Sequence, residues 1–200
     1  FQEEILNKVD TIFVPRANDD ERSCASSIVE AAHLGRKHFV EITFPMSKDK
    51  SKLKSYWLRA AKRIAEEVKG ERTAAFVTIG DPFIYSTYIY LLETLRKNFP
   101  NIALETIPGI SAFNAAAASS GLPLVKGDKR LAVLPVTKDL KGLRDALNKF
   151  DTVVLMKVGS KLDSVICLLK KMKLIKNAVL VSRAGQAGEA LAGYRRILER

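Results

Sequence analysis

The 200-residue sequence is poor in cysteine and histidine, with two of each. Cys24 and Cys167 lie too far apart for a zinc-knuckle spacing and are too few for a disulfide framework. His33 and His38 stand in or beside apolar segments without other metal-ligating residues. We therefore expect two reduced thiols, no metal site and no histidine-dependent nucleophilic triad.

Long apolar runs and the common nucleotide-binding loops are also missing. No stretch of about 18 apolar residues occurs, and the start of the sequence has no signal-peptide pattern, which predicts a cytoplasmic protein without a membrane partner. Neither G-x-G-x-x-G with a ribose-binding acid nor G-x-x-x-x-G-K-S/T is present. The usual dinucleotide and nucleoside-triphosphate cradles are therefore excluded.

What the sequence does have is positive charge and enough apolar residues for a core. Lys and Arg number 33 against 22 Asp and Glu, which gives a net charge of +11 and a pI near 9.7, and 47% of the residues are hydrophobic. The charge predicts an anionic partner, without deciding between nucleic acid and a polycarboxylate ligand. The basic runs KDKSKLK (48–54) and KKMKLIK (170–176) are interpreted as solvated helix faces.

Apolar strands and amphipathic helices alternate along the chain. Strands are predicted over residues 10–14, 39–44, 73–79, 102–107, 131–135, 152–158 and 178–182. Helices are predicted over residues 22–34, 53–68, 88–95, 111–120, 140–150 and 161–171. This order indicates βαβ units and an α/β fold with a parallel sheet.

The segment GLPLVKGDKR (121–130) interrupts the alternation with glycines, a proline and charges. We therefore predict an N-terminal α/β domain over residues 1–122, a link over 123–130 and a C-terminal α/β domain over 131–200. A ligand is expected in the cleft between two such domains.

Candidate binding residues follow the predicted strands, because ligands of α/β sheets gather at the carboxyl ends of the strands. Gly80-Asp81-Pro82 follows one strand, and Pro108-Gly109-Ile110-Ser111 follows the next, with Ser111 placed to cap a helix. Lys157-Val158-Gly159-Ser160 and Ala184-Gly185 follow two later strands. Taken singly, each motif is typical of an ordinary turn or cap.

Together, four segments resemble one family. They are FPMSKDKSKLKSYW (44–57), VTIGDPFIYSTYIYL (77–91), ETIPGISAFNAAAASSGLPLVKGDKRLAVLP (105–135) and VVLMKVG (153–159). In order and spacing they resemble the tetrapyrrole methylases, in particular the members that methylate C-20 of precorrin-2 in cobalamin biosynthesis. The resemblance implies a homodimer of two-domain α/β subunits that binds S-adenosylmethionine between its domains and methylates precorrin-2 or cobalt-precorrin-2.

The resemblance also implies site residues, though none as the base that removes the C-20 proton. The implied cofactor contacts are Gly80, Asp81, Ser86, Thr87, Ser111, Ala112, Val158 (or Lys157), Ala184 and Gly185. Candidate contacts to the carboxylates and ring of the tetrapyrrole are Arg16, Tyr85, Lys126, Lys129 and Arg130.

One departure and two alternatives accompany this interpretation. The family begins with a strand and a G-x-G-x-G-D-P loop, whereas FQEEILNKVDTIFVP (1–15) matches the helix after that loop, and the end at LAGYRRILER (191–200) also looks short. One alternative is another methylase of the same fold, acting on a different precorrin carbon, a siroheme precursor or ribosomal RNA. The other is a non-catalytic basic α/β module that binds RNA.

Overall fold

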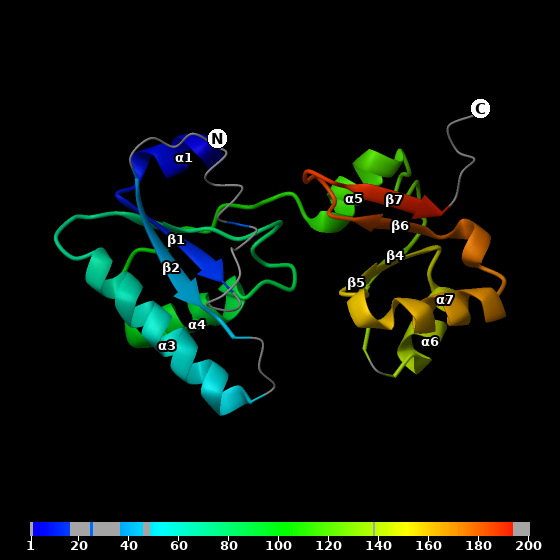
Figure 1. Ribbon diagram of the computed structural model, residues 1–200, viewed down its shortest axis with the longest axis horizontal. Coiled ribbons are helices and arrows are strands. Elements are labelled where there is room, and N and C mark those ends of the chain that lie inside the picture. Colours follow the sequence, from blue (N-terminus) through cyan, green and yellow to red (C-terminus); the bar gives the residue numbers. More distant parts are fainter. Residues whose placement is uncertain (1, 17–24, 26–36, 46–48, 138, 194–200) are drawn as a thin grey trace. The chain divides into compact units, whose positions relative to one another are not determined.

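The computed structural model describes residues 2–16, 25, 37–45, 49–137 and 139–193 (Figure 1). The predicted helix over residues 22–34, with Cys24 and His33, lies outside the described residues apart from position 25, as does Lys48. The chain divides into two compact units, Phe1–Ile110 and Ser111–Arg200. Helices alternate with parallel strand pairs in both units, which confirms the predicted α/β class.

The first unit contains a parallel sheet in the order β2-β1-β3. Phe13, in the central strand, lies opposite Val40 and Phe76 and is fully buried together with Ile12. A continuous apolar run is what a strand covered on both faces requires. The strands are β1 (Thr11–Arg16), β2 (His38–Thr43) and β3 (Ala74–Phe76).

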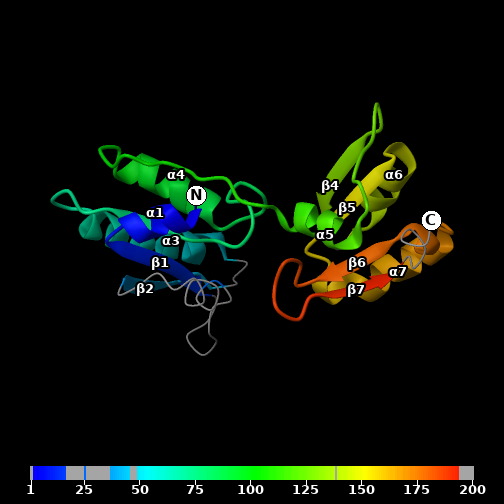
Figure 2. The same cartoon turned by 90° about the horizontal axis from the view of Figure 1, so that it is seen from above.

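Helices pack against this sheet, with Phe13 facing one set of helical residues and Ile12 and Val14 facing Leu6. The described helices are α1 (Gln2–Lys8), α3 (Lys50–Glu67) and α4 (Tyr88–Asn98). Helix α3 begins after Asp49, whose carboxylate accepts hydrogen bonds from the N–H groups of Ser51 (2.9 Å) and Lys52 (3.2 Å). Helices α3 and α4 lie together over the sheet (Figure 2). The core between these layers consists of Phe13, Ile42, Phe44, Ala60, Ala61, Ile64, Leu91 and Leu95.

The second unit combines a two-stranded parallel sheet, β4-β5, with an antiparallel hairpin, β6-β7. Its strands are β4 (Leu131–Pro135), β5 (Thr152–Met156), β6 (Val179–Ser182) and β7 (Ala190–Gly193). Its helices are α5 (Ala112–Ser120), α6 (Lys141–Lys149), α7 (Leu162–Lys171) and the 3-10 turns η1 (Gly159–Lys161) and η2 (Ile175–Asn177). A core that includes Leu143, Val165 and Leu168 joins α6 and α7 to β5, and α5 packs against β6 (Figure 1).

Two sequence predictions about strands differ from the structure. Residues 102–107 form no strand, because they pair with none of the described strands and are held instead through the side chains of Ile102 and Thr106. An apolar segment becomes a strand only where a neighbour offers its N–H and C=O groups. Conversely, β7 (ALAG) is too short and too weakly alternating for its sequence to indicate a strand, and pairing with β6 creates it.

The two compact units meet after Ile110, whereas the domains predicted from the sequence cover residues 1–122 and 131–200. Helix α5 is therefore part of the second unit. The reason is local packing, since Ser119 at its end lies 3.0 Å from the Glu189 carboxylate. The segment 123–130 consequently lies within the second unit, between α5 and β4.

Candidate functional site

Asp81 connects the two predicted loops of the first unit. One carboxylate oxygen accepts a hydrogen bond from the N–H of Phe83 (2.9 Å), and the other accepts one from the N–H of Gly109 (3.3 Å). The loop after β3 is therefore joined to the Pro108-Gly109 loop, 28 residues later. The sequence predicted both loops, but gave no sign that the carboxylate of one binds the backbone of the other.

Gly80 and Gly109 let these two loops touch. A Cβ atom on Gly109 would lie 2.3 Å from the carbonyl oxygen of Gly80, a distance that real Cβ contacts do not reach. Gly80 itself has φ +79°, in the left-handed region that glycine adopts without a steric penalty. The two glycines therefore let the backbones of these loops pack directly against each other.

A short polar network continues from these loops. The Ser86 hydroxyl lies 3.1 Å from the Thr78 hydroxyl and accepts a hydrogen bond from the N–H of Tyr88 (3.2 Å). The Tyr88 hydroxyl lies 2.5 Å from that of Thr106. Thr87 directly precedes α4, and its side chain is exposed and does not cap the helix. Sequence reasoning missed Tyr88 and Thr106, because a tyrosine at the spacing of core residues indicates only that its ring packs in the core, not that its hydroxyl forms a hydrogen bond.

Large apolar side chains around the two loops are exposed. Ile110 is 73% exposed, and Tyr85 is exposed with φ +53°, which is uncommon for a residue with a bulky side chain. Exposed apolar surface of this kind often marks a binding region. The other members of this set are Ile79, Phe83 and Ile84.

Ser111 differs from its predicted role. Its side chain does not cap α5, although its carbonyl oxygen accepts the N–H groups of Asn114 and Ala115. The residue is only 4% exposed, and its hydroxyl has no hydrogen-bond partner among the described residues. A buried hydroxyl without a partner is costly, so this oxygen is suited to receive a ligand group. The neighbouring Ala112 is exposed.

The segment after β5 separates its two candidate residues. Val158 is half-buried and packs against the core of the second unit, whereas Lys157 is exposed and has φ +56°. Gly159, which follows, begins the 3-10 turn η1. Val158 is therefore held by packing, whereas Lys157 is not among the residues of that core.

The hairpin loop between β6 and β7 carries Ala184 and Gly185. The N–H of Gly185 donates to the carboxylate of Glu189 (2.6 Å), whose same oxygen lies 3.0 Å from the hydroxyl of Ser119 in α5. These bonds, the one from Gly185 first, lower the pKa of the Glu189 carboxyl below its ordinary value. Sequence reasoning did not single out Glu189, because the residues around a single glutamate after a glycine-rich turn do not indicate which group its carboxylate binds.

Most of the basic candidates have acidic or carbonyl partners of their own. Arg16 forms an ion pair with Glu41. The Lys129 ammonium lies 3.0 Å from the Asp151 carboxylate, which also accepts the backbone N–H of Arg130 at 3.0 Å. The Arg130 guanidinium donates to the carbonyl of Lys149 and lies 5.8 Å from the Phe150 ring. Lys126 is exposed. Three of the four basic candidates, Arg16, Lys129 and Arg130, therefore already have partners within the protein, and no ligand is needed to explain their positions.

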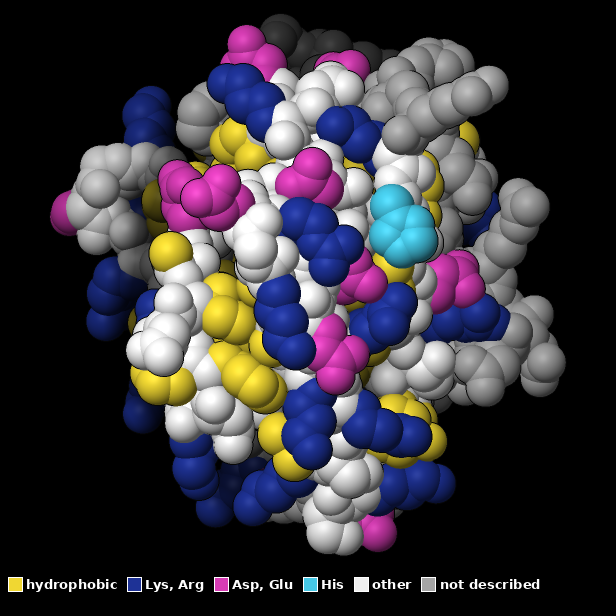
Figure 3. Space-filling view, turned by 90° about the vertical axis from the view of Figure 1, so that its left-hand side faces the viewer, with side chains coloured by type: hydrophobic (Ala, Val, Ile, Leu, Met, Phe, Trp, Pro, Cys, Tyr) yellow, Lys and Arg dark blue, Asp and Glu magenta, His cyan; other side chains and the backbone are white. Residues whose placement is uncertain are grey.

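Charge on the first unit is spread out. Figure 3 shows Lys and Arg side chains over one face with Asp and Glu side chains between them. On α3, for example, Glu67 pairs with both Arg63 (3.0 Å) and Arg72 (3.5 Å).

None of the helices in the described ranges is both long and apolar enough to cross a bilayer. In the same ranges, His, Cys, Asp and Glu side chains nowhere form a group of three or more that could hold a metal ion.

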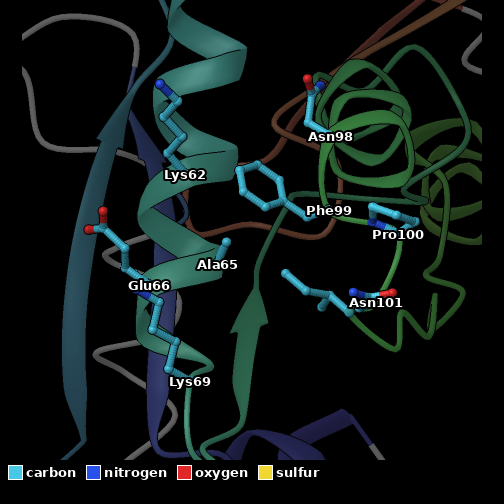
Figure 4. Close-up of a pocket in the computed structure, with 9 residues that line it drawn as sticks. Lys62, Ala65, Glu66, Lys69, Asn98, Phe99, Pro100 and Asn101 are labelled. Carbon is cyan, nitrogen blue, oxygen red and sulfur yellow. The ribbon is translucent and has the colours of Figure 1, made fainter.

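A depression of about 530 Å³ lies elsewhere, between the second half of α3 and the residues that follow α4. Lys62 of α3 and Lys69, just beyond the end of that helix, border it, and the Phe99 ring lies between α3 and the turn at Asn101 (Figure 4). None of the predicted site residues is among its lining residues. This depression and the candidate loops are therefore separate features of the first unit.

Comparison with known families and curated proteins gives one consistent result. The family model described as Tetrapyrrole (Corrin/Porphyrin) Methylases matches residues 3–193. The probable cobalt-precorrin-2 C(20)-methyltransferase of Methanocaldococcus jannaschii is 39% identical over 174 residues, which are 87% of this chain and 69% of that protein. The cobalt-precorrin-2 C(20)-methyltransferase of Salmonella typhimurium is 33% identical over 186 residues, 92% of this chain and 77% of its own length.

Solved structures agree on the fold. A cobalt precorrin-4 methyltransferase aligns with a TM-score of 0.67 at 16% identity, over 95% of this chain and 76% of its own. The uroporphyrin-III C-methyl transferase of Thermus thermophilus, complexed with S-adenyl homocysteine, aligns with a TM-score of 0.60 at 16% identity, over 95% and 78% of the two chains.

Proposed function

Because the chain belongs to the tetrapyrrole methylase family, we propose that it transfers a methyl group from S-adenosylmethionine to C-20 of precorrin-2 or cobalt-precorrin-2. The reaction belongs to cobalamin biosynthesis. The observation that carries the proposal is the similarity to C(20)-methyltransferases over most of the chain, in both the archaeal and the bacterial relative. The family assignment makes the protein an S-adenosylmethionine-dependent methyltransferase, and the relatives favour this acceptor carbon.

The described residues fit such a cofactor. Gly80 and Gly109 let two loop backbones pack together beside Asp81, and the buried Ser111 hydroxyl has no hydrogen-bond partner among the described residues. Each oxygen of the Asp81 carboxylate accepts one bond within the protein, which leaves lone pairs for a donor group of the ligand. As cofactor contacts we propose Gly80, Asp81, Ser86, Thr87, Ser111, Ala112, Val158, Ala184 and Gly185.

Positioning is the main task of these residues. S-adenosylmethionine supplies a methyl carbon that its sulfonium group already makes electrophilic. The protein therefore contributes most by holding two reactants in line, which can account for a large part of a rate enhancement. The hydrogen bonds of Asp81 hold its two loops together, and core packing fixes Val158, so neither contact has to be ordered when the ligand binds.

For the tetrapyrrole, the structure sharpens the list of candidates. Tyr85, with the exposed apolar residues beside it, offers surface for a macrocycle, and Lys126 offers an exposed cation for a carboxylate. Arg16, Lys129 and Arg130 would have to leave or share their present partners in order to bind one. We therefore favour Tyr85 and Lys126 as substrate contacts.

The test is calorimetry of S-adenosylhomocysteine binding to the full-length protein, followed by mass and NMR analysis of its product from precorrin-2 and from cobalt-precorrin-2, which gives the number and the position of the added methyl groups. We expect binding, a product heavier by one methylene unit, and binding at least about tenfold weaker for Asp81→Ala. Asp128→Ala, an exposed carboxylate in a turn, is the control. Absence of binding would overturn the proposal, and methylation at another ring position would move the protein to a different branch of the family.

We also infer a homodimer that acts in the cytoplasm without a nucleic-acid or membrane partner. The support is the family resemblance for the dimer and the low cysteine content for a reducing compartment. Light scattering of the full-length protein, with and without S-adenosylhomocysteine, would give twice the subunit mass if the dimer is correct.

A further inference from the structure

The hairpin loop over residues 183–189 holds an unusual amount of left-handed backbone. Arg183 has φ +54°, Gly185 +72° and Gly188 +80°. A non-glycine residue with such a φ persists only when its surroundings determine the conformation. Within the loop, the N–H of Gln186 donates to the carbonyl of Arg183 (2.9 Å), and that of Glu189 donates to the carbonyl of Gln186 (3.0 Å).

The Glu189 side chain supplies the remaining constraint. One carboxylate oxygen accepts the N–H of Gly185 inside the loop and lies within hydrogen-bond distance of the Ser119 hydroxyl outside it. Ser119 belongs to α5, 70 residues earlier in the chain. Gly185 also approaches α5 directly, because a Cβ atom on it would lie 3.8 Å from that of Ala115. One carboxylate thus joins the loop to the helix.

Helix α5 is the element that begins at Ser111 and Ala112. At 1.5 Å per residue, Ser119 lies about 10 Å along the helix from Ala112. The two sets of candidate cofactor contacts in the second unit are therefore placed relative to each other by a single helix and a single carboxylate.

We propose that Glu189 is a positioning residue for S-adenosylmethionine, which fixes the loop carrying Ala184 and Gly185 to α5 and so to Ser111. The inference rests on the proposed function. A 2.6 Å bond from a backbone N–H to an ionised carboxylate is among the stronger hydrogen bonds in proteins. Because Glu189 and Ser119 are both exposed, the effect of removing the bond is moderate.

The experiment compares Glu189→Ala and Glu189→Gln with the wild type in the full-length protein. Affinity for S-adenosylhomocysteine is measured by calorimetry, and kcat and both KM values are measured with tetrapyrrole. For Glu189→Ala we expect about tenfold weaker binding, a similar rise in KM for S-adenosylmethionine, unchanged KM for the tetrapyrrole and kcat within about twofold at saturation. Glu189→Gln keeps an acceptor oxygen and should lose only about threefold. Asp145→Asn on the exposed face of α6 controls for charge.

The outcomes separate the two proposals. If the wild type binds S-adenosylhomocysteine and Glu189→Ala binds it within about twofold as tightly, the positioning role is wrong and the proposed function stands. If both KM values and kcat worsen together with a lower melting temperature, Glu189 is merely structural, which also overturns the inference. If the wild type itself does not bind, the proposed function fails and this inference fails with it.

Discussion

The two units resemble each other where their strands begin and differ where their strands end. In the first unit, NKVDTIFV (7–14) leads from α1 into β1, and in the second, NKFDTVVL (148–155) leads from α6 into β5. The Asp10 carboxylate accepts the N–H of Thr73 (2.8 Å), just before β3. The Asp151 carboxylate accepts the N–H of Arg130 (3.0 Å), just before β4.

The backbone at these junctions is the same too. The N–H groups of Asp10 and Thr11 both donate to the carbonyl of Thr73, and those of Asp151 and Thr152 both donate to the carbonyl of Arg130. Each aspartate therefore fixes the register at the start of a parallel strand pair. Only the additional donor differs: the Thr73 hydroxyl for Asp10, the Lys129 ammonium for Asp151.

At the carboxyl ends, no such correspondence exists. In the first unit, Asp81 joins two loops whose backbones touch at Gly80 and Gly109. In the second, Glu189 folds a hairpin loop onto α5. The comparison teaches that the strand beginnings share one structural solution, whereas the strand ends, where the candidate ligand contacts lie, are built differently in each unit.

The largest effect should come from breaking the contact at the strand ends of the first unit. Gly109→Ala places a Cβ atom 2.3 Å from the Gly80 carbonyl, which we expect to cost about 3 kcal/mol of unfolding free energy and to abolish S-adenosylhomocysteine binding. Gly142→Ala in α6 meets nothing within 4 Å and should stabilise the protein by up to about 1 kcal/mol. Denaturant unfolding and calorimetry measure both, and equal stability of the two variants would contradict the contact.

An intermediate effect is expected at the strand beginnings. The N–H of Thr73 and then its hydroxyl lower the pKa of Asp10 below its ordinary value of 3.8, and the N–H of Arg130 and then Lys129 do the same for Asp151. Because the folded-state pKa is the lower one, each contribution is present above about pH 4 and is lost as the pH falls through the folded value.

We therefore expect Asp10→Ala and Asp151→Ala to lower the melting temperature by similar amounts at neutral pH. In both cases the difference from wild type should shrink in acid. Scanning calorimetry over a pH series measures this, with Asp145→Ala as the exposed control. Unequal losses would break the comparison, and a difference that grows in acid would contradict the sign of the pKa shifts.

The smallest effect should distinguish the two junctions. Lys129→Met removes an exposed ion pair and should lower the melting temperature by no more than about 3 °C, an effect that salt abolishes. The bond from the Thr73 hydroxyl to Asp10 carries no such salt dependence, so Thr73→Val should shift the melting temperature equally at low and high salt. Identical salt responses would show that the two additional donors are equivalent.

Sequence reasoning recovered most elements because their signals are local. The buried strand at Ile12 and Phe13 and the amphipathic helices each follow from neighbouring residues, although α3 begins at Lys50, three residues before the predicted start, because Asp49 caps it. The strand expected over residues 102–107 failed because strand formation depends on a partner elsewhere in the chain. The short strand β7 was missed because its pairing with β6, and not its own sequence, makes it a strand.

In the candidate site, too, local features could be predicted from the sequence, whereas contacts between distant residues could not. The loop at Gly80 could be located from a glycine after a strand, whereas the loop at Gly109 follows a segment that forms no strand, and the contact between the two loops joins residues 28 apart that nothing local links. The burial of the Ser111 hydroxyl and the bond between Glu189 and Gly185 likewise depend on the folded backbone. The sequence did not indicate that the two junctions are alike, because Thr73 and Arg130, which occupy equivalent positions just before β3 and β4, have chemically different side chains.

The central position of β1 has a consequence during synthesis. Its last residue, Arg16, precedes the start of β3 at Ala74 by 58 residues, from 74 minus 16. At roughly 5–20 residues per second, the ribosome needs about 3–12 seconds to supply this partner. Proteolysis of nascent chains arrested before and after β3 would measure the delay. A much shorter stretch separates β4 from β5, so the second unit completes its parallel strand pair soon after it leaves the ribosome. In the first unit, the edge of β1 at Phe13 lacks its β3 partner for longer and is accessible to chaperones during that time.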